Sequence, residues 1–303
     1  MYIAFPQMLL TMPVRSSIIV SMNRLSRQQR VSILQTLVEG NSIRATTRLT
    51  GVAKGTVLKL LADVGPVCAA FHDEKAQNLN IRRVQADEIW SFVYAKAKNV
   101  PDEHANQWGY GDVWTWTAIC ADTKFMVSWM VGMRDTVSAT FFMNDVASRL
   151  AGRIQLTTDG HRPYLTAVED AFGADAIDYS VLQKVYGADT KNDTRYSPAK
   201  CIGTKEQRIF GNPDSRHVNT SYVERQNLTM RMSMRRFTRL TNAFSKKVEN
   251  LEHAVALHFW YYNWARKHSS LKGLTPAQRV GIADHRWTLD ELVEILEDFE
   301  ASN

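Results

Sequence analysis

The sequence predicts an α/β protein, with a mixed sheet in its central part, an all-α module before it and helices after it. Between residues 82 and 182, short runs rich in Val, Ile, Phe, Trp and Tyr alternate with helical patterns. Such alternation is typical of one α/β domain. From residue 25 to residue 64, apolar residues recur instead at steps of three and four, which indicates helices alone.

The composition is that of a globular protein. Of 303 residues, 45% are hydrophobic and 22% are charged, so enough apolar surface exists to offset the entropy of ordering the chain. This excludes long-range disorder. Only three cysteines occur, far apart and without a CxxC pair, so we expect neither a disulfide framework nor a zinc site. A bacterial cytoplasm is the expected location.

The first 21 residues carry apolar patches that proline and arginine interrupt. Pro6, Pro13 and Arg15 break these patches well short of the roughly 20 residues that a membrane helix needs. We therefore expect no membrane anchor. Because regular patterning begins after Met22, we interpret residues 1–21 as an upstream extension and Met22 as the working start.

The positive charge is concentrated in two segments. The whole chain has 37 Lys and Arg against 31 Asp and Glu, a net charge of +6. Residues 1–62 hold eight Lys or Arg and one acid, and residues 225–279 hold eleven and two. Two basic segments on an otherwise acidic chain favour a polyanionic partner. The alternative is an ordinary solvated charged face.

Residues 22–64 predict three helices. The first begins after Ser26, a good N-cap, and stops near Gly40. The second spans residues 42–49, and the third runs from residue 53 or 54 to residue 61 after a turn that contains a glycine. Two helices, a tight turn and a basic helix are the layout of a helix-turn-helix DNA-binding domain.

Four residues of this module are candidate contacts to double-stranded DNA. Lys54, Thr56 and Lys59 belong to the third helix, which would enter the major groove, and Arg44 belongs to the second. A small helical bundle without a DNA role is the alternative.

The core is expected at residues 81–240, after a connector at residues 65–80 that begins with Gly-Pro. A long loop should separate the last strand from the last helix, which spans residues 220–235. The expected order, β-β-β-α-β-α-β-α, is that of the ribonuclease H-like fold. The other expected elements are strands at 82–95, 112–121, 124–132, 154–158 and 177–182, and helices at 137–150 and 163–172.

Three acids occupy informative places in this order. Asp87 lies in the first strand, Asp159 follows the fourth strand and Glu224 lies in the last core helix. Their separations are too long for a local motif, so only the fold would bring them together. Three carboxylates around one point suit two Mg²⁺ (or Mn²⁺) ions, which stabilise the attacking and leaving oxygens of phosphoryl transfer.

Each acid also has a simpler interpretation. Asp159-Gly160 is a common turn signal, and Glu224 pairs equally well with Arg225 or Arg231 on the helix surface. Glu88 is an alternative to Asp87. Because neighbours on a strand point to opposite faces, we expect only one of them to face the site, and we favour Asp87.

These acids lie in segments that resemble the IS1 family of bacterial insertion-sequence transposases, members of the DDE group. The resemblance implies that Asp87, Asp159 and Glu224 are the catalytic, metal-binding triad, with Arg231 at the basic position seven residues after the glutamate. The matching segments are DEIW with SFVYAKAK, TDGH, and VERQNLTMRMSMRRFTRLTNAFSKKVENLEHAVALHFWYYNW.

The resemblance also implies partners and a reaction. The protein would bind the terminal inverted repeats of its element and target DNA, as a dimer or higher oligomer at the nucleoid, and would cleave and join strands. It departs from the best-known member in lacking a zinc-binding cysteine cluster and in having a longer loop at residues 184–217.

Several residues near the acids are accessory candidates. Residues 224, 228, 231 and 235 would share one helix face, so Arg231 and Arg235 would hold a DNA phosphate near the metals, with Arg225 beside them. Asn227 is a candidate for contacting DNA or a metal-bound water, or is structural. His161 either acts in the site or is incidental.

The C-terminal region, residues 241–303, predicts further helices. Residues 244–267 form an amphipathic pattern with an aromatic end, which would stack on unpaired bases or, as we favour, pack on the core. A helix should start at Pro276. An acidic helix at residues 289–300 would shield basic surface or contact a second subunit.

The leading hypothesis from the sequence is a Mg²⁺-dependent DNA transposase. One alternative is a structure-selective nuclease without strand transfer. The other is an inactive or domesticated helix-turn-helix regulator whose carboxylates no longer hold metal.

Overall fold

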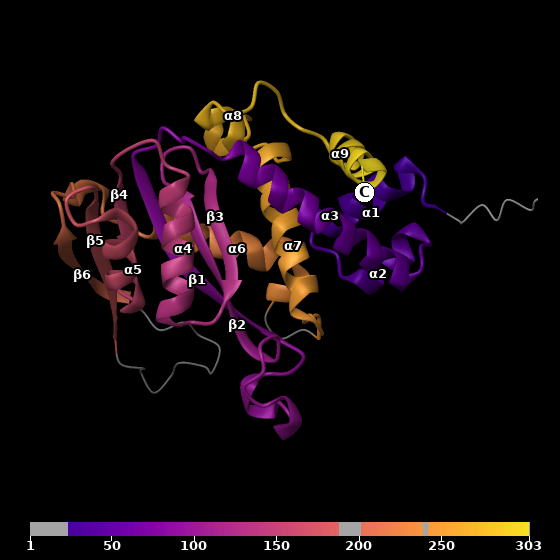
Figure 1. Ribbon diagram of the computed structural model, residues 1–303, viewed down its shortest axis with the longest axis horizontal. Coiled ribbons are helices and arrows are strands. Elements are labelled where there is room, and N and C mark those ends of the chain that lie inside the picture. The colour runs from indigo at the N-terminus through magenta and orange to yellow at the C-terminus, as the bar shows by residue number, and fades with distance from the viewer. Residues whose placement is uncertain (1–23, 188–200, 239–241, 303) are drawn as a thin grey trace, which may run out of the picture.

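The computed structural model describes residues 24–187, 201–238 and 242–302, so the expected extension at residues 1–21 lies outside it. Within this part of the chain, a mixed six-stranded sheet has the order β3-β2-β1-β4-β5-β6 (Figure 1). The strands are β1 (Arg83–Val93), β2 (Gly111–Cys120), β3 (Met126–Gly132), β4 (Gln155–Thr158), β5 (Asp178–Tyr186) and β6 (Cys201–Phe210).

The described ranges contain nine α-helices. The sequence predicted most of them within a few residues. They are α1 (Arg27–Val38), α2 (Ile43–Thr50), α3 (Lys54–Lys75), α4 (Thr136–Ser148), α5 (Pro163–Phe172), α6 (Ser221–Ser233), α7 (Val248–Trp260), α8 (Pro276–Val280) and α9 (Leu289–Ser302). None of these helices combines the length and the apolar character that a bilayer-crossing segment requires. Of the nine, α1, α2 and α9 lie to one side of the sheet (Figure 1).

The direction of the strands places their ends where a site can form. β1 pairs with β2, and β2 with β3, in antiparallel fashion, whereas β1, β4 and β5 run parallel to one another. The carboxyl ends of parallel strands meet at one edge of a sheet, where ligands commonly bind. On β1, only residues 83–85 pair with β4. The part of β1 that follows residue 85 therefore has no strand beside it on the β4 side.

Helices cover both faces of the sheet. On one face, buried Trp116 of β2 lies against Phe142 of α4 and Tyr164 of α5, with ring centroids 5.8 and 5.4 Å apart. On the other face, the Gln85 side chain of β1 accepts hydrogen bonds from the first backbone N–H groups of α6. The core therefore has the layers of an α/β domain.

The N-terminal helices begin and end as the sequence predicts. Ser26 caps α1 in a reciprocal capping box with Gln29, and Ser42 caps α2. Gly51 ends α2 in the left-handed conformation, with φ of 72°, which glycine adopts at little cost.

The third helix does not end at residue 61 as predicted. α3 continues to Lys75 and includes Gly65 and Pro66, so the expected connector is mostly helix. Gly65 serves close packing, since a Cβ there would lie 2.5 Å from the Cβ of His253 on α7. Gly65 thus has a packing role where α3 and α7 cross, and the Gly-Pro pair does not interrupt the helix.

Three further boundaries differ from the prediction. β6 falls within the expected loop at residues 184–217, where most of its side chains are exposed, so no apolar alternation revealed it. Residues 188–200 of that loop lie outside the described part. α6 ends at Ser233, not at residue 235, and α7 begins at Val248, not at residue 244.

The aromatic end of α7 packs inside the protein. Phe259, Trp260 and Trp264 are fully buried, as the packing interpretation predicted. Asn263, in a π-helical turn, accepts a hydrogen bond from the backbone N–H of Met126 and donates one to its carbonyl, both at 2.9 Å. This pair of bonds fixes the edge strand β3 to the helices.

The acidic helix α9 packs on α1 and α3. Its carboxylates reach the basic residues of α1: Arg27 lies 3.3 Å from Glu297, and Arg30 lies 3.1 Å from Glu300. Of the two roles expected for this helix, shielding basic surface is the one that these contacts favour.

Candidate functional site

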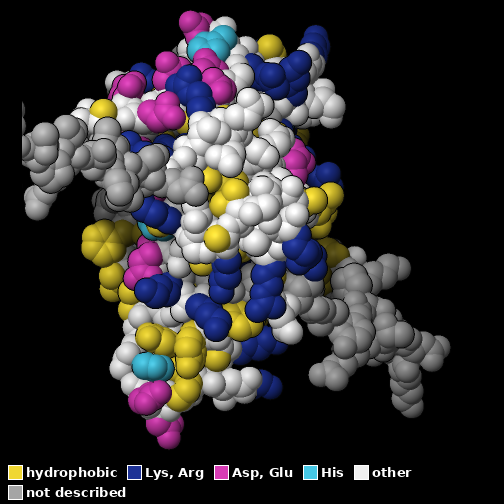
Figure 2. All heavy atoms as spheres, turned by 90° about the vertical axis from the view of Figure 1, so that its right-hand side faces the viewer, with side chains coloured by type: hydrophobic (Ala, Val, Ile, Leu, Met, Phe, Trp, Pro, Cys, Tyr) yellow, Lys and Arg dark blue, Asp and Glu magenta, His cyan; other side chains and the backbone are white. Residues whose placement is uncertain are grey.

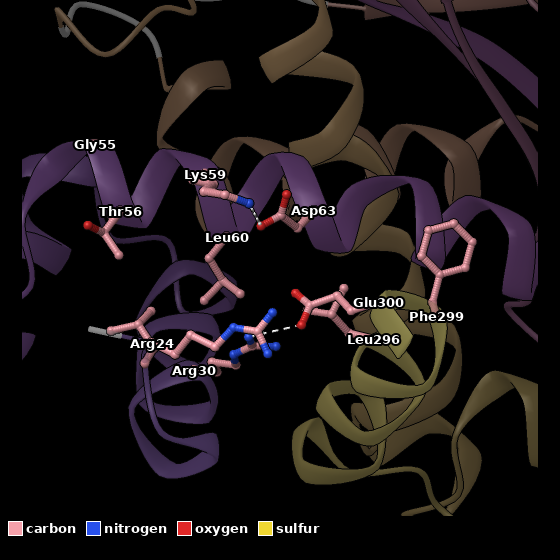
Figure 3. A pocket seen from close by; sticks show the side chains of 11 residues that line it. Arg24, Arg30, Gly55, Thr56, Lys59, Leu60, Asp63, Leu296, Phe299 and Glu300 are labelled. Carbon is pink, nitrogen blue, oxygen red and sulfur yellow. Dashed lines mark hydrogen bonds and ion pairs between the residues drawn. The ribbon is translucent and has the colours of Figure 1, made fainter. Parts of the chain in front are cut away.

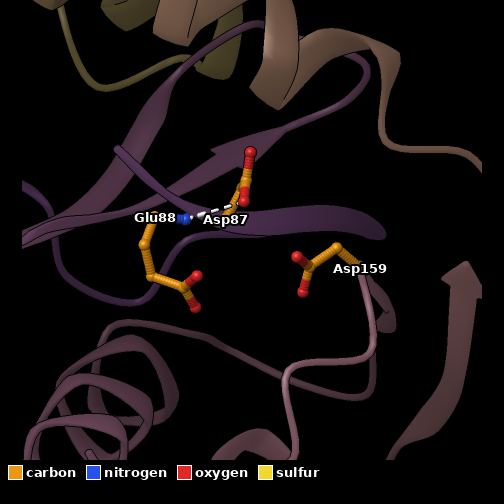
Figure 4. A group of neighbouring side chains, drawn as sticks. All are labelled: Asp87, Glu88 and Asp159. Carbon is orange, nitrogen blue, oxygen red and sulfur yellow. Dashed lines mark hydrogen bonds between the residues drawn. The ribbon is translucent and has the colours of Figure 1, made fainter. Parts of the chain in front are cut away.

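Three carboxylates converge at the edge of the sheet where β1 passes the end of β4. Asp87, Glu88 and Asp159 each offer an oxygen within 4.8 Å of the others (Figure 4). We call these residues the carboxylate cluster. Asp87 and Glu88 lie in β1, and Asp159 directly follows β4.

Glu88 belongs to this cluster, contrary to the expectation that only one neighbour would face the site. The two side chains do leave β1 on opposite sides, but Asp159 lies at the sheet edge between them (Figure 4). The Asp87 carboxylate also turns along the strand, because its Oδ1 accepts a hydrogen bond from the Glu88 backbone N–H at 2.8 Å. Two neighbouring side chains that leave a strand on opposite sides can therefore still bind the same cation at the end of the sheet.

Glu224 approaches the carboxylate cluster from α6. It lines the same cavity as Asp87 and Asp159, but its carboxylate is bonded to other groups. Thr220 donates a hydrogen bond to it at 2.6 Å, and the Lys184 ammonium forms an ion pair with it. The structure thus brings the three predicted acids to one cavity, and closest to one another are Asp87, Glu88 and Asp159.

Asn227 links α6 to the carboxylate cluster. Its Nδ2 donates a hydrogen bond to Asp87 Oδ2 at 2.8 Å. The side chain is buried, and its Oδ1 has no hydrogen-bond partner among the residues that the structure describes. Asn227, one turn after Glu224, therefore orients Asp87, which fits the structural alternative for this residue.

The cavity around these residues has a volume of about 650 Å³, which is ample for a phosphate and its metal ions. It is lined by carboxylates and by the cations Lys184 and Arg231. Its lining residues are Asp87, Glu88, Asp159, Leu182, Gln183, Lys184, Tyr186, Thr220, Glu224, Asn227 and Arg231.

Burial and repulsion between like charges disfavour ionisation of Asp87 and Glu88. Burial, followed by the charges of Asp159 and Glu88, raises the pKa of Asp87 to about 8. Burial and the charge of Asp159 likewise raise the pKa of Glu88 to about 7. Like charges at such distances favour a proton or a cation between them.

Arg134 is a site residue that the sequence analysis missed. Its guanidinium lies 3.4 Å from Glu88 Oε2 and 4.7 Å from the ring centre of Trp114. It lies in the turn between β3 and α4, where no local motif marks it. Lys184, also missed, lies on β5, and its place near the carboxyl end of a strand parallel to β4 was the available signal.

Gly160 allows the chain to turn sharply after Asp159. Its φ is +93°, and a Cβ there would lie 2.8 Å from Val181. His161 follows: its backbone N–H donates to Asp159 Oδ1 at 2.9 Å, and its ring lies 5.9 Å from that of Trp116. Burial, followed by the charge of Arg134, lowers the pKa of His161, which favours a neutral packed ring.

The three predicted arginines around α6 lie in different surroundings. Arg231 lines the cavity. Arg225 lies on an exposed part of α6. Arg235 is exposed but lies beyond the end of α6, in a short 3-10 turn at Arg235–Phe237. The prediction that residues 224, 231 and 235 share one helix face is therefore wrong for Arg235.

The N-terminal candidates lie on a different part of the molecule. Arg44 and Lys54 are exposed. Thr56 and Lys59 line a second cavity of about 670 Å³ between α1, α3 and α9 (Figure 3). Lys59 pairs with Asp63 at 2.7 Å, and Glu300 of α9 lies across the cavity.

Basic side chains are conspicuous on one surface. Figure 2 shows Lys and Arg gathered between the helical upper part and the connection of β1 to β2, which projects lowest in Figure 1. Among the basic residues that precede α7, Arg235, Lys246 and Lys247 are exposed.

The carboxylate cluster has the donor set that a hard divalent cation prefers. All its ligand atoms are carboxylate oxygens, and one of them, Glu88 Oε1, is buried, with the Tyr164 hydroxyl as a hydrogen-bonding neighbour of the Glu88 carboxylate. The unpartnered Asn227 Oδ1 is a further oxygen nearby. These residues therefore fit Mg²⁺ or Mn²⁺.

Neither a scan against models of protein families nor a search of curated proteins found a match for this chain. Its function is accordingly inferred from the chemistry of its residues.

Proposed function

We propose that the chain is a Mg²⁺-dependent DNA transposase of the DDE group, with a ribonuclease H-like catalytic core and an N-terminal helix-turn-helix domain. The observation that carries the proposal is the convergence of Asp87, Glu88 and Asp159 within 4.8 Å in a cavity that Glu224 also lines. Asp159 and Glu224 are far from the adjacent pair Asp87 and Glu88 in the sequence, and all four line one cavity.

The order of the elements supports the proposed core. Three antiparallel strands are followed by α4, β4, α5 and β5, which is the order expected of a ribonuclease H-like fold up to the added strand β6. The candidate acids lie in the central strand, after its parallel neighbour and in a helix packed on the sheet, as the resemblance to the IS1 family implies.

The charged residues suit a phosphodiester substrate. Asp87, Glu88 and Asp159 would hold the metal ions, with Glu224 joining once Lys184 releases it. The ions supply charge neutralisation for the attacking and leaving oxygens. Lys184 and Arg231 line the same cavity, where each would bind a phosphate oxygen of the DNA strand.

The N-terminal helices would bind the ends of the element. Exposed Arg44 and Lys54, with Lys59 at the start of α3, would contact phosphates, and Thr56 a base edge or phosphate. Because two ends must be cut and joined together, we infer a dimer or a larger assembly on DNA in the bacterial cytoplasm.

The test is an assay with purified protein, Mg²⁺ and a duplex that carries the inverted repeat flanking the gene. A transposase yields cut and joined strands, a nuclease yields cut strands only, and a regulator yields a shifted band alone. Joined products support the proposal, and either of the other results overturns it.

Matched variants assign the residues. Asp87→Asn, Asp159→Asn and Glu224→Gln should each lower cleavage by about 10³-fold or more, because each removes a charge from the metal site, while end binding survives. Glu88→Gln decides between two roles for this residue. A comparable loss identifies a ligand, and near wild-type cleavage identifies a neighbour that only tunes Asp87. Full cleavage by any of the first three variants would contradict the role of that residue.

A further inference from the structure

A row of partly accessible aromatic side chains leads away from the carboxylate cluster along β1 and β2. Trp90 and Phe92 follow Glu88 at alternate positions of β1, so all three project from the same face of the sheet. Trp114 of β2 lies directly opposite Trp90 and projects from that face too. We call Trp90, Phe92 and Trp114 the aromatic row.

The aromatic row differs from the core beside it in exposure. Trp116, opposite Glu88, is fully buried under α4 and α5. One pair further along the strands, Trp90 and Trp114 are partly accessible, and so is Phe92. The ring centres of Trp90 and Phe92 are 5.7 Å apart. Trp90, Trp114 and Phe92 are therefore partly accessible beside a polar site, although Phe244 packs on Phe92 with ring centres 4.9 Å apart.

Cations accompany these rings. Arg134 lies over Trp114 at 4.7 Å and also contacts Glu88, so one side chain joins the carboxylate cluster to the aromatic row. The Lys96 ammonium lies 6.0 Å from the centre of the Phe92 ring. Aromatic platforms with interspersed cations are the combination that binds single-stranded nucleic acids, because bases stack on the rings while cations meet phosphates.

We propose that the aromatic row binds unpaired nucleotides of the DNA strand next to the phosphate held at the carboxylate cluster. This inference rests on the proposed function and adds a preference for frayed or single-stranded flanks. Bases in a duplex already stack on each other, so the rings would engage only bases freed from pairing. Arg134 would place the first phosphate of this segment beside Glu88.

The first experiment measures binding without metal. Fluorescein-labelled oligothymidine is titrated with the full chain in EDTA and followed by fluorescence anisotropy. Trp90→Leu and Trp114→Leu should each weaken binding about tenfold, the scale of one lost stacking contact, whereas Trp114→Phe should retain most of it. The control is Phe141→Leu, which changes an exposed aromatic on α4 outside the row and should leave the affinity unchanged.

A second measurement does not depend on the variants folding. Oligothymidine that contains 5-bromodeoxyuridine is photocrosslinked to the wild-type chain, and the attached peptides are mapped. Attachment within residues 83–93 or 111–120 supports the inference, and attachment only elsewhere overturns it. The inference would also be overturned if Trp90→Leu and Trp114→Leu each bound oligothymidine with the affinity of the wild type.

The outcomes separate this inference from the proposed function. If the wild type cleaves end-bearing duplex with Mg²⁺ and the leucine variants cleave paired and frayed ends equally well, the function stands and the aromatic row has no such role. If oligothymidine binding depends on the row but no cleavage occurs, the row binds nucleic acid and the proposed catalysis fails.

Discussion

At the scale of single residues, the carboxylate cluster of Asp87, Glu88 and Asp159 is the main evidence for a metal site. Asp87 is held between two hydrogen bonds, from the Glu88 backbone and from Asn227, and faces two other carboxylates. Its position is fixed, yet its charge is costly without a cation. Such a group stores free energy that metal binding releases.

This cost leads to a prediction for Asp87→Asn in metal-free protein. Asp87 has a pKa of about 8 in the folded chain and roughly 3.9 when unfolded, so the folded state binds more protons between these values. The free energy of unfolding of the wild type should therefore fall as pH rises from about 4 to about 8. The asparagine variant has no carboxylate to ionise at this position. At pH 8 it should therefore be more stable than the wild type, by on the order of 1 kcal/mol or more.

Urea unfolding at pH 5 and pH 8 in EDTA tests this prediction. Excess Mg²⁺ should raise the stability of the wild type at pH 8 and have little effect on the variant. If the free energy of unfolding depends on pH in the same way for both proteins, ionisation of Asp87 does not destabilise the folded chain.

At the scale of elements, the crossing of α3 and α7 connects the N-terminal helices to the core. Gly65 lies where α3 meets His253 of α7, and Phe71 of α3 packs against Trp260 of α7 with ring centres 6.0 Å apart. The two helices are thus closely packed, although the sequence alone suggested a connector there.

Gly65→Ala should destabilise this joint. The added methyl group would meet both backbone and side-chain atoms of His253 within 2.7 Å, so the helices must separate, at a cost of about 1–3 kcal/mol. Thermal unfolding of the variant measures it. Gly55→Ala is the matched control, since a Cβ at Gly55, also in α3, meets nothing within 4 Å and should be neutral or stabilising. Equal destabilisation by both would contradict the packing argument.

The ion pairs of α9 make a second prediction at this scale. Glu297→Gln and Glu300→Gln together would release Arg30 and remove the shortest of three ion pairs of Arg27, which keeps Asp290 and Glu294 at 3.7 Å. Because exposed pairs contribute at most about 1 kcal/mol, stability should change little, while affinity for random duplex DNA should rise a few-fold. Band shifts at two salt concentrations measure this. Asp298→Gln, at an α9 acid outside these pairs, should have a smaller effect than the double change. An unchanged affinity would show that α1 does not meet DNA.

Elements with strong local signals could be predicted from the sequence, and those set by tertiary packing could not. Ser26 and Gly51 marked helix ends through their own hydrogen bonding and backbone freedom. β6 carried no such signal, because its exposed side chains lack alternation. The continuation of α3 through Pro66 depends on a partner helix that no local pattern reveals.

The candidate site was predictable to a similar extent. Asp87, Asp159 and Glu224 could be selected from their places in successive elements, and the structure brings them to one cavity. The inclusion of Glu88 depends on Asp159 lying at the sheet edge. The partners Lys184 and Arg134 depend on how strands and loops meet in space, which spacing alone does not specify.

At the scale of the whole molecule, two regions of interest are separated. The carboxylate cluster lies at the sheet edge, and the N-terminal helices lie beside α9 at the other end of Figure 1. Long DNA would bridge both, so each region should contribute its own share of binding.

Lys54→Ala and Lys59→Ala should therefore weaken end binding and reduce the dependence of log K on log salt by about 0.9 per lost phosphate contact. Cleavage of a short duplex without the repeat should be less affected. Titrations between 50 and 200 mM salt measure the slope. An unchanged slope would place the repeat-binding surface elsewhere.

The order of the acids along the chain has a consequence for synthesis of the protein. Asp87 leaves the ribosome first, but its neighbour in the cavity, Glu224, is added only 137 residues later. No nascent chain that lacks α6 holds the complete set, so a prematurely terminated product that ends before α6 would carry the N-terminal helices but no finished site. Such fragments would occupy DNA ends without cutting them.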